Sequence, residues 1–167
     1  MSRLRVILDV LRLAVLHPNW TVDADSTLRA LGADAAERTA ARDAVTEVFG
    51  RARVHPHGEA ANTAVMLTAA GVGDEPDLRS ALRAVKTLAA LAGVPLEDSC
   101  TVVCKTLATD RFTSDTAYVI QSWGVPIHRM LADVRGEHPA QTVMSIAVGR
   151  VTALDLLDAL TDPKGTP

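Results

Sequence analysis

Hydrophobic residues recur along this chain at the three- and four-residue spacing of α-helices. The first such stretch, LRVILDVLRLAVLHP, runs from Leu4 to Pro18, and its charged residues form one narrow stripe of Arg5, Asp9 and Arg12. A helix with so wide an apolar face is stable only when neighbouring elements cover it on several sides. We therefore expect this helix to be sandwiched between others, as in a stacked helical array or a compact bundle.

The same periodicity continues in short segments separated by turn signals, and it predicts about eight to ten helices in all. We expect the second helix to begin near Asp25 or Ser26, either of which is a good N-cap residue. A third helix is predicted from about residue 35 to 49, closed by Gly50. Residues 51–61 are interpreted as a loop. No strand pattern competes with this interpretation, so the predicted fold class is all-α.

Composition favours one helical domain. The chain has 167 residues and is 48% hydrophobic but only 3% aromatic, so small aliphatic side chains form most of the expected core. Such side chains allow close helix packing, and a chain of this length can bury a sizeable core. We expect a single domain over residues 1–161 and a disordered tail over 162–167.

Charge and hydropathy limit the classes of partner. The net charge of −3 gives no general attraction to nucleic acid or to anionic lipid. No run of about 18 uncharged apolar residues exists, so no membrane span is expected. Arg3, Arg5 and Arg12 interrupt the apolar start and make it a poor signal peptide. These features predict an intracellular protein. The expected compartment is the cytoplasm, with the nucleus as a second compartment.

The residues that usually carry catalysis or bind metals form no recognisable motif. The sequence has no phosphate-binding loop, no nucleophile elbow and no zinc-protease signature. Cys100 and Cys104 lie four residues apart on one helical face, and no histidine has ligand-like spacing to them. Buried structural thiols explain this pair better than metal ligands do. We expect no enzyme activity, no catalytic residue, no metal site and no cofactor.

Basic residues without acidic partners on their own helix are the more informative signal. Arg79, Arg83 and Lys86 lie at i, i+4 and i+7 of one predicted helix, so they form a stripe on it. Arg38 and Arg42 form an i, i+4 pair on another predicted helix. Each such residue alone has an ordinary explanation as part of a solvated helix face. Together, bases from several helices can converge on one groove that binds an anionic ligand. The candidate residues are Arg42, Arg38, Lys105, Arg79, Arg83 and Lys86.

One segment resembles a known carrier domain. The stretch LGADAAERTAARDAVTEVFG, which starts at Leu31, is similar to the second helix of acyl carrier proteins. In that family a serine after the aspartate carries the phosphopantetheine group. Here Asp34 is followed by Ala35, which has no hydroxyl to modify. A degenerate carrier-like or small enzyme domain is the least favoured interpretation.

Four segments, taken in order, resemble PUL domains, the armadillo-like modules of phospholipase-A2-activating-protein relatives. ILDVLRLAVLHPN resembles the apolar helix that opens the family, and ERTAARDAVTEVF resembles a family helix with Arg42 on its arginine. ANTAVMLTAAGV and CTVVCKTLATDRFTSDTAYVIQSWGV resemble the family's short Ala/Leu helix and its closing segment. The chain is shorter than a typical PUL domain. The family's Gly-Thr is replaced by Lys105 and Thr106.

This resemblance implies an armadillo-like right-handed helical superhelix, with a compact multi-helix bundle as the alternative. It also implies a basic groove that binds the acidic C-terminal tail of the AAA ATPase of ubiquitin-dependent protein turnover (Cdc48/p97). Such a tail carries an aromatic residue near its end. The predicted function is therefore a non-enzymatic peptide-binding adaptor. The alternative is a structural or assembly protein whose helices contact only neighbouring subunits. Of the groove residues, Arg42 alone follows from the resemblance, and the other five follow from charge pattern.

Overall fold

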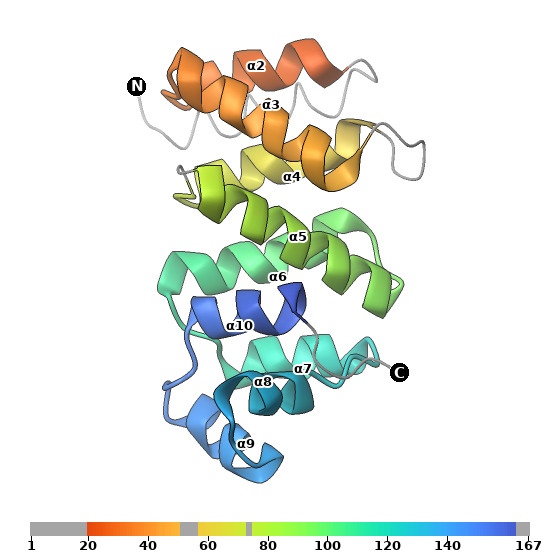
Figure 1. The fold of residues 1–167 in the computed structure, drawn as a ribbon, viewed down its shortest axis with the longest axis vertical. Coiled ribbons are helices and arrows are strands. Elements are labelled where there is room, and N and C mark those ends of the chain that lie inside the picture. Colours follow the sequence, from red (N-terminus) through yellow and green to blue (C-terminus); the bar gives the residue numbers. More distant parts are fainter. Residues whose placement is uncertain (1–19, 51–56, 73–74, 163–167) are drawn as a thin grey trace. The chain divides into compact units, whose positions relative to one another are not determined.

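The computed structural model describes residues 20–50, 57–72 and 75–162 (Figure 1). These residues form nine helices and no strand, which confirms the predicted all-α class. Both an armadillo-like arrangement and a helical bundle agree with this content. The predicted helix from Leu4 to Pro18 and most of the predicted tail lie outside the described residues.

The chain divides into two compact units, residues 1–78 and 79–167. The described part of unit 1 contains α2 (Trp20–Ala30), α3 (Ala35–Phe49) and α4 (His57–Ala69). Helix α5 (Glu75–Ala92) begins in unit 1 and continues into unit 2. The expectation of a single domain over residues 1–161 stays a prediction.

Helix α4 packs against both α2 and α3, and α2 also contacts α3. The side chains buried between them are small or aliphatic, with Leu28, Ala44 and Leu67 almost wholly removed from solvent. Helix α3 starts as predicted, because Asp34 caps it. The Asp34 carboxylate accepts hydrogen bonds from the backbone N–H groups of Ala36 and Glu37, and the Glu37 carboxylate accepts one from the Asp34 N–H. This reciprocal pair is a capping box.

Two predicted boundaries in unit 1 are wrong. Helix α2 starts at Trp20, so Asp25 lies inside the helix and is not its N-cap. The Asp25 carboxylate accepts hydrogen bonds from the side chains of Arg29 and Arg38, so its oxygens have partners without the backbone N–H groups that an N-cap residue would accept from. Helix α4 starts at His57 and not at Asn62, so part of the predicted loop is helical. Buried Ala60 lies in this added turn, and tertiary packing there overrides the loop-like local sequence.

Unit 2 contains most of α5 and five further helices. Their bounds are α6 (Leu96–Thr109), α7 (Ser114–Ser122), α8 (Ile127–Arg135), α9 (Pro139–Ala147) and α10 (Ala153–Thr161). Pro95 occupies the N-cap position of α6, and Asp98 lies in the first turn of that helix. A proline there needs no hydrogen-bond acceptor, since it has no N–H to donate.

Helix α10 is last in the sequence but packs against both α6 and α8 (Figure 1). Two hydrogen bonds join the connection between α6 and α7 to the residues that lead into α10. The Phe112 N–H donates to the Val151 carbonyl at 2.9 Å, and the Ala153 N–H donates to Asp110 Oδ1 at 3.3 Å. Phe112 itself is fully buried. The core of unit 2 therefore joins residues about 40 positions apart along the chain.

Candidate functional site

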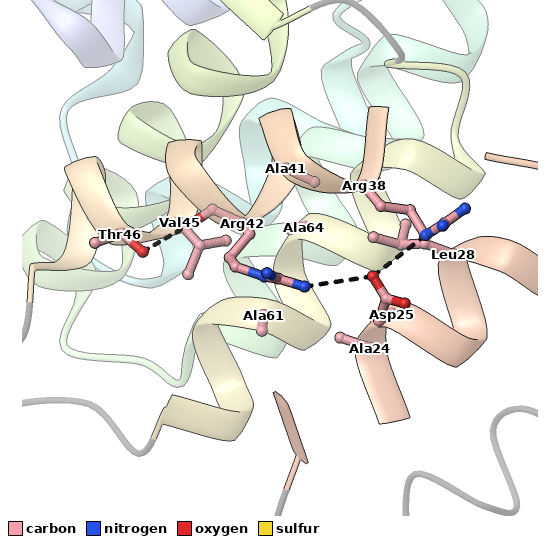
Figure 2. Close-up of a pocket in the computed structure, with 10 residues that line it drawn as sticks. All are labelled: Ala24, Asp25, Leu28, Arg38, Ala41, Arg42, Val45, Thr46, Ala61 and Ala64. Atoms are coloured by element: carbon pink, nitrogen blue, oxygen red, sulfur yellow. Dashed lines mark hydrogen bonds and ion pairs between the residues drawn. The ribbon is translucent and has the colours of Figure 1, made fainter. Parts of the chain in front are cut away.

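A pocket of about 400 Å³ opens among α2, α3 and α4 of unit 1 (Figure 2). Small side chains make most of its wall, because alanine at contact positions keeps the helices close while leaving space above them. Asp25 of α2 and the arginine-bearing face of α3 supply the polar part. The lining residues are Ala24, Asp25, Leu28, Arg38, Ala41, Arg42, Val45, Thr46, Ala61 and Ala64.

The polar side of the pocket is an ion cluster centred on Asp25. Asp25 Oδ1 accepts from Arg38 Nε at 3.2 Å and from Arg42 Nη2 at 3.4 Å, and Oδ2 accepts from Arg29 Nη2 at 3.3 Å. Figure 2 shows Arg38 and Arg42 extending from α3 toward Asp25 on α2. One carboxylate thus faces three guanidinium groups. The cluster has an excess of positive charge, which suits an anionic ligand.

Arg38 is a structural member of this cluster. Its side chain is only 16% exposed. Besides the bond to Asp25, its Nη1 donates to the Ala33 carbonyl at 2.8 Å, so it joins α3 to the middle of α2 and to the turn between the two helices. A guanidinium held at both ends in this way has little freedom to reorganise around a ligand.

Arg42 is held more weakly. Its side chain is 68% exposed, and its 3.4 Å contact with Asp25 exceeds the roughly 2.7–2.9 Å of a strong charge-assisted hydrogen bond. An exposed pair of this kind contributes about 0–1 kcal/mol to stability. Among the described residues, no other side chain accepts from Arg42. Its guanidinium is therefore the group at this pocket best able to bind an incoming carboxylate.

The sequence-predicted residues fall into two sets. Arg38 and Arg42 come together at the pocket in unit 1, as expected for an i, i+4 pair. The others belong to unit 2, where Arg79 is half-buried, Arg83 and Lys86 are exposed on α5, and Lys105 is exposed on α6. Convergence of all six on one groove stays a prediction.

Arg38 and Arg42 share an acidic partner from a neighbouring helix, and the expectation concerned only partners on their own helix. No acid lies at the right spacing on α3, but Asp25 reaches them from α2, 13 and 17 positions away in the sequence. Sequence reasoning also missed the alanine wall supplied by Ala61 and Ala64. The only local signal was the i, i+4 spacing of Asp25 and Arg29, which placed both on one helical face.

Two further features are absent from the described parts of the chain. No group of three or more histidine, cysteine, aspartate or glutamate side chains is placed to hold a metal ion there. No helix within those parts is long and apolar enough to cross a membrane.

Comparison of the chain with protein-family models, with curated proteins and with solved structures found no match in any of the three.

Proposed function

We propose that the chain is a non-enzymatic peptide-binding adaptor module whose pocket in unit 1 binds an acidic peptide with an aromatic residue. The observation that carries this proposal is the exposed Arg42 guanidinium beside an alanine-lined hollow. A volume of about 400 Å³ lies within the roughly 300–1,000 Å³ range of ligand pockets. The apolar wall suits an aromatic side chain, and Arg42 suits a carboxylate on the same peptide.

The more specific ligand comes from the resemblance to PUL domains. It is the acidic C-terminal tail of the AAA ATPase of ubiquitin-dependent protein turnover. Such a tail has both features that the pocket requires, carboxylates and an aromatic residue near the end. This assignment makes the chain an adaptor in that pathway, acting in the cytoplasm or nucleus.

The expected energetics are modest, because Asp25 already occupies one side of Arg42. A peptide carboxylate must share the guanidinium with Asp25 or displace it. A hydrogen bond to a charged group contributes roughly 1.5–3 kcal/mol, and the lost Asp25 contact offsets about 0–1 kcal/mol of this. Binding should weaken as salt rises, since the groups involved are exposed.

Calorimetric titration of an acidic peptide with a terminal aromatic residue tests the proposal. Arg42→Ala should weaken binding by about 10- to 100-fold, which corresponds to about 1.4–2.7 kcal/mol. Arg29→Ala is the matched control, because Arg29 is 67% exposed and contacts the same carboxylate but does not line the pocket. It should bind the peptide within about twofold of the unmodified chain, a change of about 0.4 kcal/mol.

Two further peptides separate the contributions of charge and of the apolar wall. Replacing the aromatic residue by alanine, or the acids by their amides, should each weaken binding to the unmodified chain. Equal affinity of Arg42→Ala and Arg29→Ala would show that Arg42 does not contact the ligand. Absence of binding at low salt would reject the adaptor proposal as a whole.

A role as an assembly protein is the second candidate, and exposed apolar side chains in unit 2 favour it. Val143, Met144 and Val148 on or just after α9 are 44%, 65% and 61% exposed, and Leu154 on α10 is 64% exposed. Exposed apolar groups that gather on one helix can mark an interface between subunits. Light scattering on the purified chain tests this candidate. A self-assembled species that Met144→Glu converts to monomer would favour it.

A further inference from the structure

Cys100 and Cys104 bring their sulfur atoms together on helix α6. They are one helical turn apart, and the two Sγ atoms lie 3.6 Å from each other. Cys100 is fully buried, whereas Cys104 is half-buried. Exposed Thr101 and Lys105 flank Cys104 on the helix surface, so the pair can be reached from the Cys104 side.

The 3.6 Å separation suits a single atom bonded to both sulfurs. With bonds of about 2.3 Å, the length of a zinc–sulfur bond, two sulfurs 3.6 Å apart define an angle of roughly 103° at the bridging atom. This is close to the angle at a tetrahedral or pyramidal centre. Such an atom could be bound without moving the helix.

A disulfide fits the same helix less well. It requires Cβ atoms about 3.5–4.5 Å apart, whereas residues at i and i+4 of a helix place theirs about 5–6 Å apart. Closing the disulfide would therefore distort α6, and Val102 and Val103 between the two cysteines are both buried. The geometry favours a bridging atom over direct oxidation.

The two thiols also differ in acidity. The hydrogen bond from Cys100 lowers the pKa of Cys104, although burial acts in the opposite direction. The pKa of Cys100 is raised, first by that same hydrogen bond, then by burial and by the negative charge of Cys104 and Glu97. The more accessible sulfur is thus the better nucleophile, and the buried sulfur keeps its proton until a second bond forms.

We propose that Cys100 and Cys104 form a two-thiol binding site for one soft, thiophilic centre of the trivalent organoarsenical class. Each sulfur replaces one hydroxyl of an arsonous acid, R–As(OH)₂, so two As–S bonds form and two water molecules leave with the thiol protons. Arsenic stays trivalent, and no oxidant or reductant is needed. Its third bond is to carbon, so the site needs no further protein ligand. This matches the lack of any third metal-binding side chain near the pair among the described residues.

Phenylarsine oxide is the probe, added to the native chain and followed by intact mass. The expected result is one phenylarsenic group per chain, loss of both reactive thiols and an unchanged helical circular dichroism signal. A dithiol such as 2,3-dimercaptopropanol should remove the group, and a monothiol should not. Two groups per chain, or loss of helical signal on binding, would contradict the proposed bridge.

Cys104→Ala and Cys100→Ala test the requirement for both sulfurs. Each should lower the affinity by about 10²- to 10⁴-fold, the usual gain from joining two binding groups in one site. Circular dichroism shows whether each variant is folded. If Cys100→Ala loses its fold, Cys104→Ala serves alone, since Cys104 is only half-buried. A folded single-cysteine variant that keeps the original affinity would overturn the proposal.

Discussion

Phe112 is the side chain whose removal should damage unit 2 most clearly. It lies in the connection between α6 and α7 and is 0% exposed. Among the described residues, it is the largest side chain that is fully buried. Burying a phenylalanine removes roughly 150–250 Å² from water, and at about 25 cal/mol per Å² this contributes ~4–6 kcal/mol. The alanine side chain in its place still buries some apolar surface and keeps part of this stabilisation. Phe112→Ala should therefore lower the free energy of unfolding by about 3–5 kcal/mol.

The backbone contact should survive the substitution. The Phe112 N–H bond to the Val151 carbonyl does not involve the side chain, so the loss should come from packing alone. Phe112→Leu keeps most of the volume and should cost less than about 1.5 kcal/mol. This milder variant keeps the prediction measurable if Phe112→Ala is unfolded at room temperature.

Urea unfolding followed by tryptophan fluorescence measures the effect. The chain has two tryptophans, Trp20 in α2 and Trp123 at the end of α7, so a Trp20→Phe background leaves Trp123 as a reporter within unit 2. Tyr118→Ala is the matched aromatic control, since Tyr118 is 74% exposed and should change stability by less than about 0.5 kcal/mol. Equal losses for Phe112→Ala and Tyr118→Ala would refute this account of the core.

Three further predictions follow from the ion pairs and caps. Asp34→Ala should destabilise α3 by about 1 kcal/mol, measured by urea unfolding, because it removes the capping box; no change would mean that the cap is not formed in solution. The Arg135 guanidinium, 2.8 Å from Glu137, lowers the pKa of that carboxyl below its ordinary value of 4.5, so its stabilisation is complete above pH 4.5 and is lost as pH falls through the folded-state value. Glu137→Gln should therefore flatten the acid limb of a stability–pH curve, and an unchanged limb would contradict the pairing. Asp25→Ala should tighten binding of the acidic peptide by about fivefold, worth ~1 kcal/mol, because it releases Arg42; weaker binding in calorimetry would contradict this role of Asp25.

Local sequence signals predicted most of the helices, because their causes lie within a few residues. Asp34 caps α3 and Thr152 caps α10 through contacts three positions away. Gly136 ends α8 in the left-handed conformation at φ 63°, which a glycine adopts without strain. The starts of α2 and α4 could not be predicted in this way. Their first turns depend on packing within unit 1, which no window of local sequence contains.

The candidate site was only half predictable for the same reason. The i, i+4 spacing of Arg38 and Arg42 placed both on one face of α3. Their shared partner Asp25 comes from another helix, so charge pattern alone suggested two unpaired arginines. The alanine wall also gave no signal, because Ala61 and Ala64 resemble any small residues of a helix. Pockets arise where three elements meet, and their shape depends on tertiary packing.

The central claim is that the pocket of unit 1 binds the acidic peptide. Nuclear magnetic resonance of the isotope-labelled chain tests it most directly, by following the Arg42 Nε–H signal and the methyl signals of Ala41, Ala61 and Ala64 during a peptide titration. The account predicts that these signals shift together and saturate with one dissociation constant, while the Tyr118 signals in unit 2 stay in place. Saturable shifts confined to unit 2, with the Arg42 and alanine signals unmoved, would contradict it.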